Sequence, residues 1–351
     1  MHERRTPLTN PSDPASALVP VAGTPSSPAL PDIVQRAGEA AVFATEEFFY
    51  GKIRNEHTRS AYLHAVKQFL AWCERCGLEL ARITPRDVGQ YFDGLRKKYL
   101  SVATRKQHLA ALRHFFDGLV MRHVVILNPA LSVRGDRYEV VEGKTPEITV
   151  RHARDLLASI EVVRKIKLDD GTETETSRLV GLRDRAMVAT LMYTASRAGA
   201  VALLKRAHFY HAGDQWMLHF DEKGGKSREI PVRHDLERII ASYIEAAGLQ
   251  HAPKDSPLFR PALGKTGRLA GRAIHVNDIC RMVKRRLKDA SLPAHLSPHS
   301  FRVTVITDLL EHGVPLEDVQ HLAGHADPRT TRLYDRRQKR VTRNLVEKIS
   351  I

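Results

Sequence analysis

The stretch LSPHSFRVTVITDLLEHGVPLEDVQHLAGHADPRTTRLY, residues 296–334, sets polar residues into a helical apolar pattern. Ser297 and Pro298 begin a helix, because serine caps a helix N-terminus well and proline suits the first helical position. His299 and Arg302 follow three residues apart, so both project from one face of the first turn. This part of the stretch therefore predicts a helix with two polar side chains at its start.

The second part of the stretch presents another histidine and a tyrosine. Gly324 ends a second helix, since glycine readily takes the left-handed backbone of a helix C-terminus. His325 follows this glycine directly, and Tyr334 lies nine residues after His325. The whole stretch thus predicts short helices that carry two histidines, an arginine and a tyrosine.

Two charged residues stand in unusual places earlier in the chain. Arg197 follows an apolar helical pattern in YTASRAGAVALL, where small and apolar neighbours would solvate a charge poorly. Lys223 lies at a Gly-Gly turn in DEKGGKSREIPV, between two runs that are typical of hairpin strands. Taken singly, such an arginine is usually an ion-pair partner and such a lysine is usually solvated.

Taken together, these six residues can carry out phosphodiester transesterification without a metal ion. The reaction needs an oxygen nucleophile, cations on the non-bridging oxygens and an acid for the leaving alkoxide. Two arginines can bind those oxygens through bidentate hydrogen bonds. A tyrosine, with an ordinary pKa of about 10, needs a general base or a positive field to become a phenolate. Because the motifs lack the acidic cluster that two-metal catalysis uses, we expect no cofactor and no metal.

The sequences of these motifs resemble those of the tyrosine recombinase (phage integrase) family. The resemblance is carried by H-S-F-R at 299–302, L-A-G-H at 322–325 and Tyr334 at the familiar distance. An arginine box and a K-G-x-K hairpin precede them in the expected order, and the similarity extends over about residues 45–345. It implies a site-specific recombinase that cuts and rejoins double-stranded DNA at recombination sites. Strand exchange would pass through a Holliday junction in a homo-tetramer, for DNA integration, excision or transposition.

The resemblance also implies the roles of the polar residues. Tyr334 would be the nucleophile, forming a 3′-phosphotyrosyl link and freeing a 5′-hydroxyl. Arg197 and Arg302 would hold the scissile phosphate. His299 would act as a base toward the tyrosine or as a proton shuttle, and His325 would hydrogen-bond the phosphate.

Two positions of the motif set are left open by the sequence. Lys223 would protonate the leaving 5′ oxygen, with Lys226 as the alternative, because the register of a hairpin cannot be fixed from sequence. The family's first box commonly reads T-G-L-R with an acid three residues later. Here residues 194–197 read T-A-S-R, and Ala200 stands in the place of the acid. Arg197 is therefore expected to have another partner, or the site to depend more on assembly.

Composition and periodicity divide the chain into five segments. Seven of the eighteen prolines fall in the first forty residues without sustained periodicity, which is typical of a flexible tail. The predicted fold is mainly α with a small β-sheet. By resemblance, the N-terminal helical bundle is the family's core-binding domain, and the α+β domain that follows is its catalytic domain. The segments are a tail at 1–40, the core-binding domain at 41–132, a linker at 133–148, the catalytic domain at 149–345 and a C-terminal tail at 346–351.

Within the second domain, helical patterns surround one β segment. That segment is a hairpin formed by residues 216–220 and 228–232. Helices are predicted at 150–160, 180–195, 234–247, 275–290 and 298–312.

The charge balance indicates a polyanionic partner. Lys and Arg number 55 against 40 acidic residues, for a formal net charge of +15, and cations placed on phosphates release counterions. By resemblance, both domains would close around a duplex as a clamp. Solvated charged faces are the alternative for the basic helices. The candidate DNA contacts are Arg105, Lys106, Arg281, Lys284 and Arg285.

Other features narrow the location and leave alternatives for the function. Three cysteines make no disulfide framework, and no signal peptide or membrane span is evident, so a cytoplasmic, nucleoid-associated protein is expected. In the family, an apolar C-terminal tail such as Leu345–Ile351 often docks on a neighbouring protomer. The alternatives are DNA relaxation like that of a type IB topoisomerase, and a catalytically silent DNA-binding accessory factor.

Overall fold

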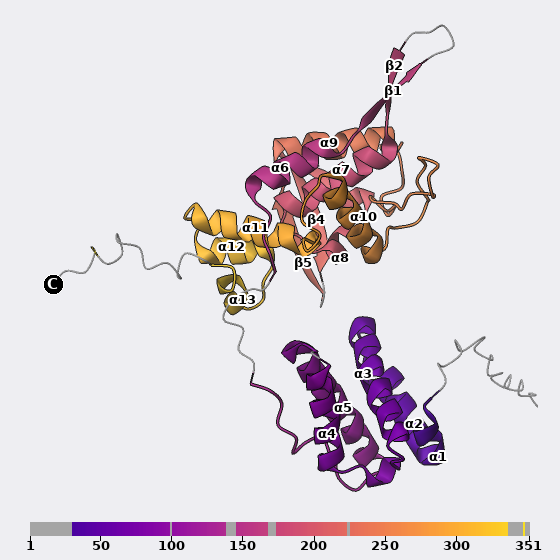
Figure 1. The fold of residues 1–351 in the computed structure, drawn as a ribbon. Helices are drawn as coiled ribbons and strands as arrows, with labels where there is room; N and C mark the ends of the chain where they lie inside the picture. The colour runs from indigo at the N-terminus through magenta and orange to yellow at the C-terminus, as the bar shows by residue number, and fades with distance from the viewer. Residues whose placement is uncertain are drawn as a thin grey trace, which may run out of the picture. The chain divides into compact units, whose positions relative to one another are not determined.

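The computed structural model describes residues 30–98, 100–137, 145–167, 173–222, 225–335 and 347. These residues belong to two compact units that divide after residue 139. Both units are mainly helical, and the strands of the described residues all lie in the second (Figure 1). The mainly α fold with a small β content that the sequence predicts is therefore confirmed.

The first unit packs its helices around an aromatic core. Its elements are α1 (Asp32–Arg36), α2 (Glu39–Glu46), a π-helical turn (Glu47–Lys52), α3 (Glu56–Arg75), a 3-10 turn (Leu80–Arg82), α4 (Pro85–Lys97) and α5 (Val102–Met121). Asn55, Thr84 and Ser101 cap α3, α4 and α5 through their side-chain oxygens. Phe69 on α3 packs edge-on against Phe116 on α5, and both rings are fully buried.

The expected tail at 1–40 is too long at its C-terminal end. Ile33 and Val34 of α1 are buried in the core of the first unit. The backbone N–H of Ile33 also donates to Glu74 Oε1 on α3 at 2.9 Å. The five-residue helix is too short to show a periodicity among the prolines, which explains why the sequence pattern missed it. Residues 1–29 lie outside the described residues.

The expected linker at 133–148 is likewise packed at both of its ends. In the first unit, Arg113 donates to the Val133 carbonyl at 2.8 Å, and Asp136 pairs with Arg105 at 2.7 Å. In the second unit, Ile148 is buried, and its backbone N–H and C=O both bond to the Thr304 hydroxyl at 2.9 Å. Residues 138–144 lie outside the described residues.

The second unit is built around the buried helix α7. Its helices are α6 (Val150–Ser159), α7 (Leu179–Tyr193), α8 (Ala198–Ala202), α9 (His234–Ala246), α10 (Val276–Asp289), α11 (Pro298–Glu311), α12 (Leu316–Ala323) and α13 (Pro328–Arg332). The five helices that the sequence predicts in this unit are confirmed, each within two residues at either end. No helix among the described residues combines the length and apolarity needed to cross a membrane.

A three-stranded antiparallel sheet contains the predicted hairpin. Its strands β3 (Phe209–Ala212), β4 (Gln215–Glu222) and β5 (Lys226–Pro231) lie in that order. The register pairs Leu218 with Ile230 and Glu222 with Lys226. Because side chains alternate between the faces of a strand, Glu222 shares the face of the buried residues Leu218 and Phe220. The alternation along β4 thus turns an acidic side chain inward near the hairpin turn.

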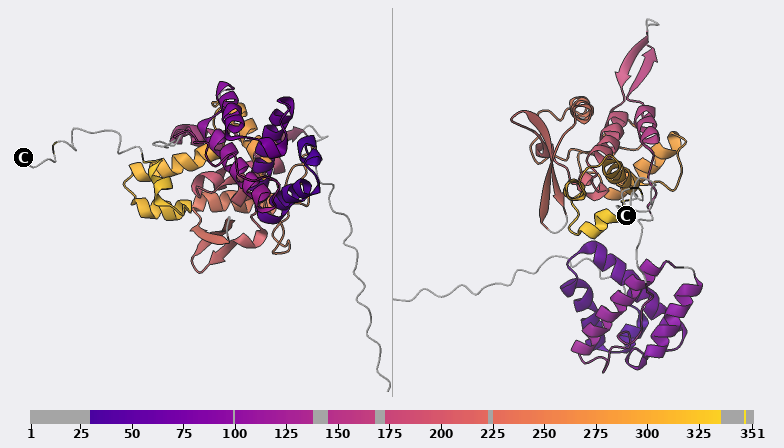
Figure 2. Two further views of the ribbon diagram at one scale, coloured as in Figure 1. Left: turned by 90° about the horizontal axis from the view of Figure 1, so that it is seen from below. Right: turned by 90° about the vertical axis from the view of Figure 1, so that its left-hand side faces the viewer.

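The prediction of a single β segment is wrong. A second hairpin, β1 (Val163–Lys167) with β2 (Glu173–Ser177), lies between α6 and α7 in the chain and projects from the rest of the second unit (Figures 1 and 2). Its strands are largely exposed, so they lack the apolar alternation by which a strand is recognised. The alternating threonines Thr174 and Thr176 were the available signal.

Candidate active site

His299 and Tyr334 face each other in the second unit. His299 lies in the first turn of α11, where Ser297 and Ser300 form a capping box and Pro298 starts the helix. The His299 Nε2 atom is 3.2 Å from the Tyr334 hydroxyl oxygen, so one of the two atoms can donate to the other. The helix start predicted from the sequence therefore brings a candidate base to a candidate nucleophile.

The Tyr334 side chain is held in place by its surroundings. It is 8% exposed and packs with Val303 and Ile306 of α11. Its ring stacks on His325, with 5.9 Å between centroids and 12° between planes. The Thr307 hydroxyl donates to the Tyr334 carbonyl oxygen at 3.4 Å. All these contacts lie within one chain, so His299 and Tyr334 can meet in a single protomer.

Arg302 is a fully buried cation beside this pair. Its guanidinium donates to the backbone carbonyls of Ala195 and Ala323, and its Nε has no hydrogen-bond partner among the described residues. Burial, together with the charges of the neighbouring Arg197 and Arg228, lowers the pKa of Arg302 to about 10. A buried arginine with a spare donor among other cations suits a bound anion.

Arg197 approaches the same place from the N-cap of α8. Its side chain is 49% exposed, and its Nη1 pairs with Glu222 Oε2 at 3.3 Å. The turn before it is tight, because Ala195 has a φ of 49° in the left-handed region that favours glycine. The structure thus gives Arg197 a carboxylate partner from β4, in the absence of an acid at Ala200.

His325 follows the left-handed Gly324 that ends α12, as the sequence predicts. Its Nδ1 is 2.9 Å from the Thr331 hydroxyl, which fixes the ring. Burial lowers the pKa of His325 to about 3, helped by Arg302 and Arg197. A histidine with so low a pKa is neutral at pH 7 and can serve as a hydrogen-bond donor or acceptor.

His299 experiences the same positive surroundings. The protein packed around its ring lowers the pKa of His299, and the charges of Arg302 and Arg197 act in the same direction. Since the lowered pKa lies below 6.5, the imidazole is neutral at pH 7. Neutral His299 can accept a proton from Tyr334.

Of the two lysines that are candidates for protonating the leaving 5′ oxygen, Lys226 is among the described residues. Lys223 lies outside the described residues. Lys226 begins β5 and lines an open hollow of about 750 Å³, together with Glu222, Arg228 and His325. Lys226 and His325 therefore line the same hollow.

Sequence reasoning missed Arg228 and Glu222. Arg228 is largely buried on β5, where it donates to the Ser196 hydroxyl at 3.0 Å and pairs with Glu222 at 3.1 Å. Burial lowers the pKa of Arg228, and the carboxylate of Glu222 opposes this. The signal that could have found Glu222 is the alternation Leu218, Phe220, Glu222, which places the carboxylate on the apolar face.

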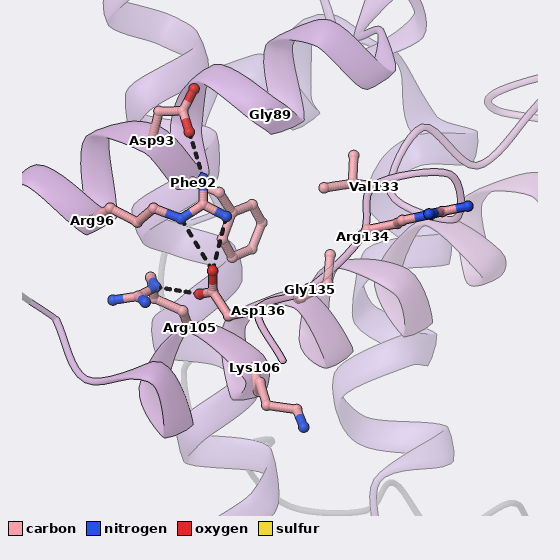
Figure 3. Close-up of a pocket in the computed structure, with 11 residues that line it drawn as sticks. Gly89, Phe92, Asp93, Arg96, Arg105, Lys106, Val133, Arg134, Gly135 and Asp136 are labelled. Atoms are coloured by element: carbon pink, nitrogen blue, oxygen red, sulfur yellow. Dashed lines mark hydrogen bonds and ion pairs between the residues drawn. The ribbon is translucent and has the colours of Figure 1, made fainter. Parts of the chain in front are cut away.

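The candidate DNA contacts of the first unit differ in how they are engaged. Asp136 binds both Arg96 and Arg105, at 2.9 and 2.7 Å, in a small pocket (Figure 3). Arg105 also donates to the Leu100 carbonyl and is only 13% exposed. Lys106 lines the same pocket and is exposed. Arg105 is therefore committed to an internal ion pair, and Lys106 is accessible.

The candidates on α10 lie apart from the contacts around Tyr334. Arg281 is 77% exposed and pairs with Asp278 on the same helix at 2.5 Å. Lys284 donates to the Ala294 carbonyl at 2.6 Å. Arg285 pairs at 3.0 Å with Asp184, which is fully buried in α7. Of the two arginines, Arg281 is the more exposed, at 77% against 54% for Arg285, and it pairs with a residue of its own helix.

Known proteins resemble the chain in sequence over both units. The model of the phage integrase family matches residues 172–340, and that of the phage integrase N-terminal SAM-like domain matches residues 47–125. The tyrosine recombinase XerD of Chlorobaculum tepidum is 26% identical over 280 residues, covering 79% of this chain and 85% of the relative. The tyrosine recombinase XerC of Pelobacter propionicus is 29% identical over 285 residues, covering 79% and 84%.

Solved structures share the fold. The XerH recombinase in its post-cleavage complex with a palindromic difH substrate gives a TM-score of 0.61 at 19% identity, covering 80% of this chain and 77% of that one. The lambda integrase(75-356) dimer bound to a COC′ core site gives 0.60 at 16% identity, covering 92% and 99%. The chain therefore belongs to the tyrosine recombinase (phage integrase) family, whose members are metal-independent DNA strand transferases that carry out site-specific recombination.

Proposed function

We propose that this chain cleaves DNA by attack of Tyr334 on a backbone phosphate, with His299 as the base. The observation that carries the proposal is the 3.2 Å contact between His299 Nε2 and the Tyr334 hydroxyl. The tyrosine oxygen bonds to phosphorus while its proton passes to His299, and the bond from phosphorus to the 5′ oxygen breaks. The resulting 3′-phosphotyrosyl ester retains the energy of the broken bond, so a 5′-hydroxyl can reverse the step and join strands.

The cations around Tyr334 are suited to stabilise the charge that develops on the phosphate. Arg302 and Arg197 would bind the non-bridging oxygens, where an arginine fork fits best. Neutral His325 would hydrogen-bond the same phosphate. Lys223, or Lys226 in the hollow beside His325, would give the leaving 5′ oxygen its proton.

The test is to trap and locate the adduct. The full chain is incubated with genomic DNA fragments of its host and denatured, and the covalently held ends are sequenced. A duplex with the mapped site and a nick beside it then lets the freed fragment diffuse away, which traps the adduct. We expect one defined cleavage position and, after digestion, a nucleotide on the peptide of Tyr334. Adduct on another residue, or none at any site, would contradict the proposal.

The lowered pKa of His299 predicts the pH dependence of cleavage. A protonated His299 cannot accept the tyrosine proton, so the rate falls when the pH drops through its pKa. With DNA below saturation, the rate reports the free protein, and its acidic limb is expected to have a midpoint below pH 6.5. Initial rates of adduct formation between pH 4.5 and 8 measure this limb. A midpoint at or above pH 6.5 would contradict the burial and the positive surroundings assigned to His299.

We also propose that strand exchange passes through a Holliday junction in a tetramer of this chain on two DNA sites. The proposal is supported by the similar fold of lambda integrase, which has been solved as a tetramer bound to a Holliday junction. This chain matches a chain of that structure with a TM-score of 0.58 at 15% identity. Sedimentation on a synthetic junction is expected to give four chains per junction. Relaxation of a supercoiled plasmid that holds no second site would favour the topoisomerase-like alternative. Whether exchange integrates, excises or transposes DNA depends on where the two sites lie.

We propose that Lys106 and Arg281 contact the DNA backbone, since both are exposed. Lys284, which donates to a local carbonyl, would contribute less. Arg105 and Arg285 would act mainly through their acidic partners Asp136 and Asp184, which hold them against the protein. Phosphate contacts of this kind raise affinity without reading sequence.

A further inference from the structure

We propose that Glu222 is the positioning carboxylate of this active site, holding Arg197 toward the scissile phosphate where Ala200 supplies no acid. The inference rests on the proposed function, because it assumes that Arg197 binds that phosphate. Glu222 itself would touch neither DNA nor the reacting atoms. It would act through the guanidinium it binds.

The contacts of Glu222 place it between two arginines. It is the last residue of β4, and its side chain is 9% exposed. Oε2 lies 3.3 Å from Arg197 Nη1, and Oε1 lies 3.1 Å from Arg228 Nη2. Among the described residues, Arg197 makes its ion pair with Glu222 and with no other carboxylate. The sheet therefore provides an anchor for a side chain that is otherwise half exposed.

The charges explain why a carboxylate is needed here. Arg197, Arg228 and Arg302 stand close enough for their charges to act on one another. Arg228 is largely buried, and a buried charge without a counter-charge is strongly destabilising. Glu222 pairs with Arg228 and Arg197 at once, so it offsets the repulsion that would push the exposed Arg197 away from the site.

The turn that precedes His325 also restricts the position of the Glu222 carboxylate. A Cβ atom at position 324 would lie 2.9 Å from Glu222 Oε2, so the missing side chain of Gly324 lets the carboxylate pack against this turn. Gly324 immediately precedes His325. Glu222 thus contacts the turn before His325 while it binds Arg197. One residue of the hairpin therefore helps to position both Arg197 and His325, the two proposed phosphate ligands.

The mechanism follows from the geometry of a guanidinium. Arginine has five N–H donors, and one ion pair to Glu222 leaves others free for a phosphate oxygen. An anchored guanidinium loses less freedom when the phosphate binds and moves less from its productive position. Partners that orient the ligands of a metal ion typically affect activity by about 10- to 100-fold, and we expect an effect of that order for the partner that orients Arg197.

The test compares Glu222→Gln with the matched control Glu229→Gln. Both change one carboxylate to an amide on the same hairpin, but Glu229 is exposed and binds Tyr210 and His219. On the nicked duplex, we expect Glu222→Gln to slow adduct formation about 10- to 100-fold. Its Kd for DNA should change little, and Glu229→Gln should behave like the unaltered chain. Equal rates for the two variants would overturn the inference.

A second substrate separates positioning from a general structural defect. A methylphosphonate at the scissile position replaces one charged non-bridging oxygen by a methyl group, so the arginines have less charge to stabilise. If Glu222 acts through Arg197, the deficit of Glu222→Gln relative to the unaltered chain should largely disappear on this substrate. An equal deficit on both substrates would show a structural role and overturn the proposal.

Glu222→Asp keeps the test decisive if the glutamine variant does not fold. Aspartate keeps a negative charge at the end of β4, so Arg228 is not left without a counter-charge, but the loss of one methylene lengthens the ion pairs to both Arg228 and Arg197. We expect the same deficit on the phosphate substrate, in smaller degree, and the same recovery on methylphosphonate. Failure of the unaltered chain to form a Tyr334 adduct would instead reject the proposed function, which distinguishes the two failures.

Discussion

A chain carrying Tyr334→Phe is expected to form no covalent adduct with DNA while it binds the same site with unchanged affinity. The substitution removes only the oxygen that would bond to phosphorus. The phenylalanine ring can keep the stacking on His325 and the packing against Val303 and Ile306. Losing the hydrogen bond to His299 costs about 1 kcal/mol of stability, which leaves the fold intact. Denaturing gels measure the adduct, and gel shifts on the mapped site measure affinity.

Tyr210→Phe is the matched control for this prediction. It makes the same chemical change in the same unit, where the Tyr210 hydroxyl donates to the exposed Glu229 at 2.8 Å. We expect it to form adduct at the rate of the unaltered chain. Measurable adduct with Tyr334→Phe after long incubation would mean that another side chain is the nucleophile, and the site would have to be reassigned.

The parts of the site that the sequence predicts are those specified by local signals. The helix start at Ser297 and Pro298 and the left-handed Gly324 each depend on neighbours along the chain. These signals place His299 in the first turn of α11 and His325 just after the end of α12, independently of contacts with distant parts of the chain. The contact between His299 and Tyr334 spans 35 residues, and no local rule gives it. That juxtaposition was expected only from the resemblance to a family.

Glu222 alternates with Leu218 and Phe220 on β4, and Arg228 alternates with Ile230 on β5, so the apolar face of each strand is readable from the sequence. The ion pair between Glu222 and Arg228 is not, because it depends on the register that pairs Phe220 with Arg228. A slip of one strand by one residue would turn that strand's set to the other face and separate the pair. The same sequence, DEKGGKSREIPV, is therefore compatible with a solvated turn or with a buried ion pair, and only the tertiary structure decides between them.

The elements that sequence reasoning missed have weak signals for a physical reason. The strands β1 and β2 bury little, so no apolar face selects for alternation. Helix α1 has five residues, fewer than two turns, and depends on Ile33 and Val34 packing in the first unit. By contrast, α7 is buried nearly all round and α10 buries one long stripe, and their limits followed from the pattern to within two residues.

Arg302→Lys is expected to lower adduct formation by about a thousandfold or more, although the positive charge is kept. An arginine that stabilises a phosphoryl transition state is worth about 10³- to 10⁵-fold. Arg302 donates to the Ala195 and Ala323 carbonyls with two nitrogens while its Nε stays free, an arrangement that only a planar fork provides. A lysine can reach one of these partners but cannot also present a second donor in a fixed direction. Single-turnover adduct formation on the nicked duplex measures the loss.

Arg113→Lys separates this loss from a loss of stability. Arg113 also donates to two backbone carbonyls, those of Ala130 and Val133, but it lies in the first unit. In each variant a carbonyl that loses its donor costs about 1–3 kcal/mol, with the larger loss of stability expected at the fully buried Arg302. Thermal unfolding gives the folded fraction of each, and the rates are compared per folded molecule. Equal rates would mean that Arg302 only supports the Ala195 turn and the end of α12, whereas a loss confined to Arg302→Lys requires its guanidinium at the phosphate.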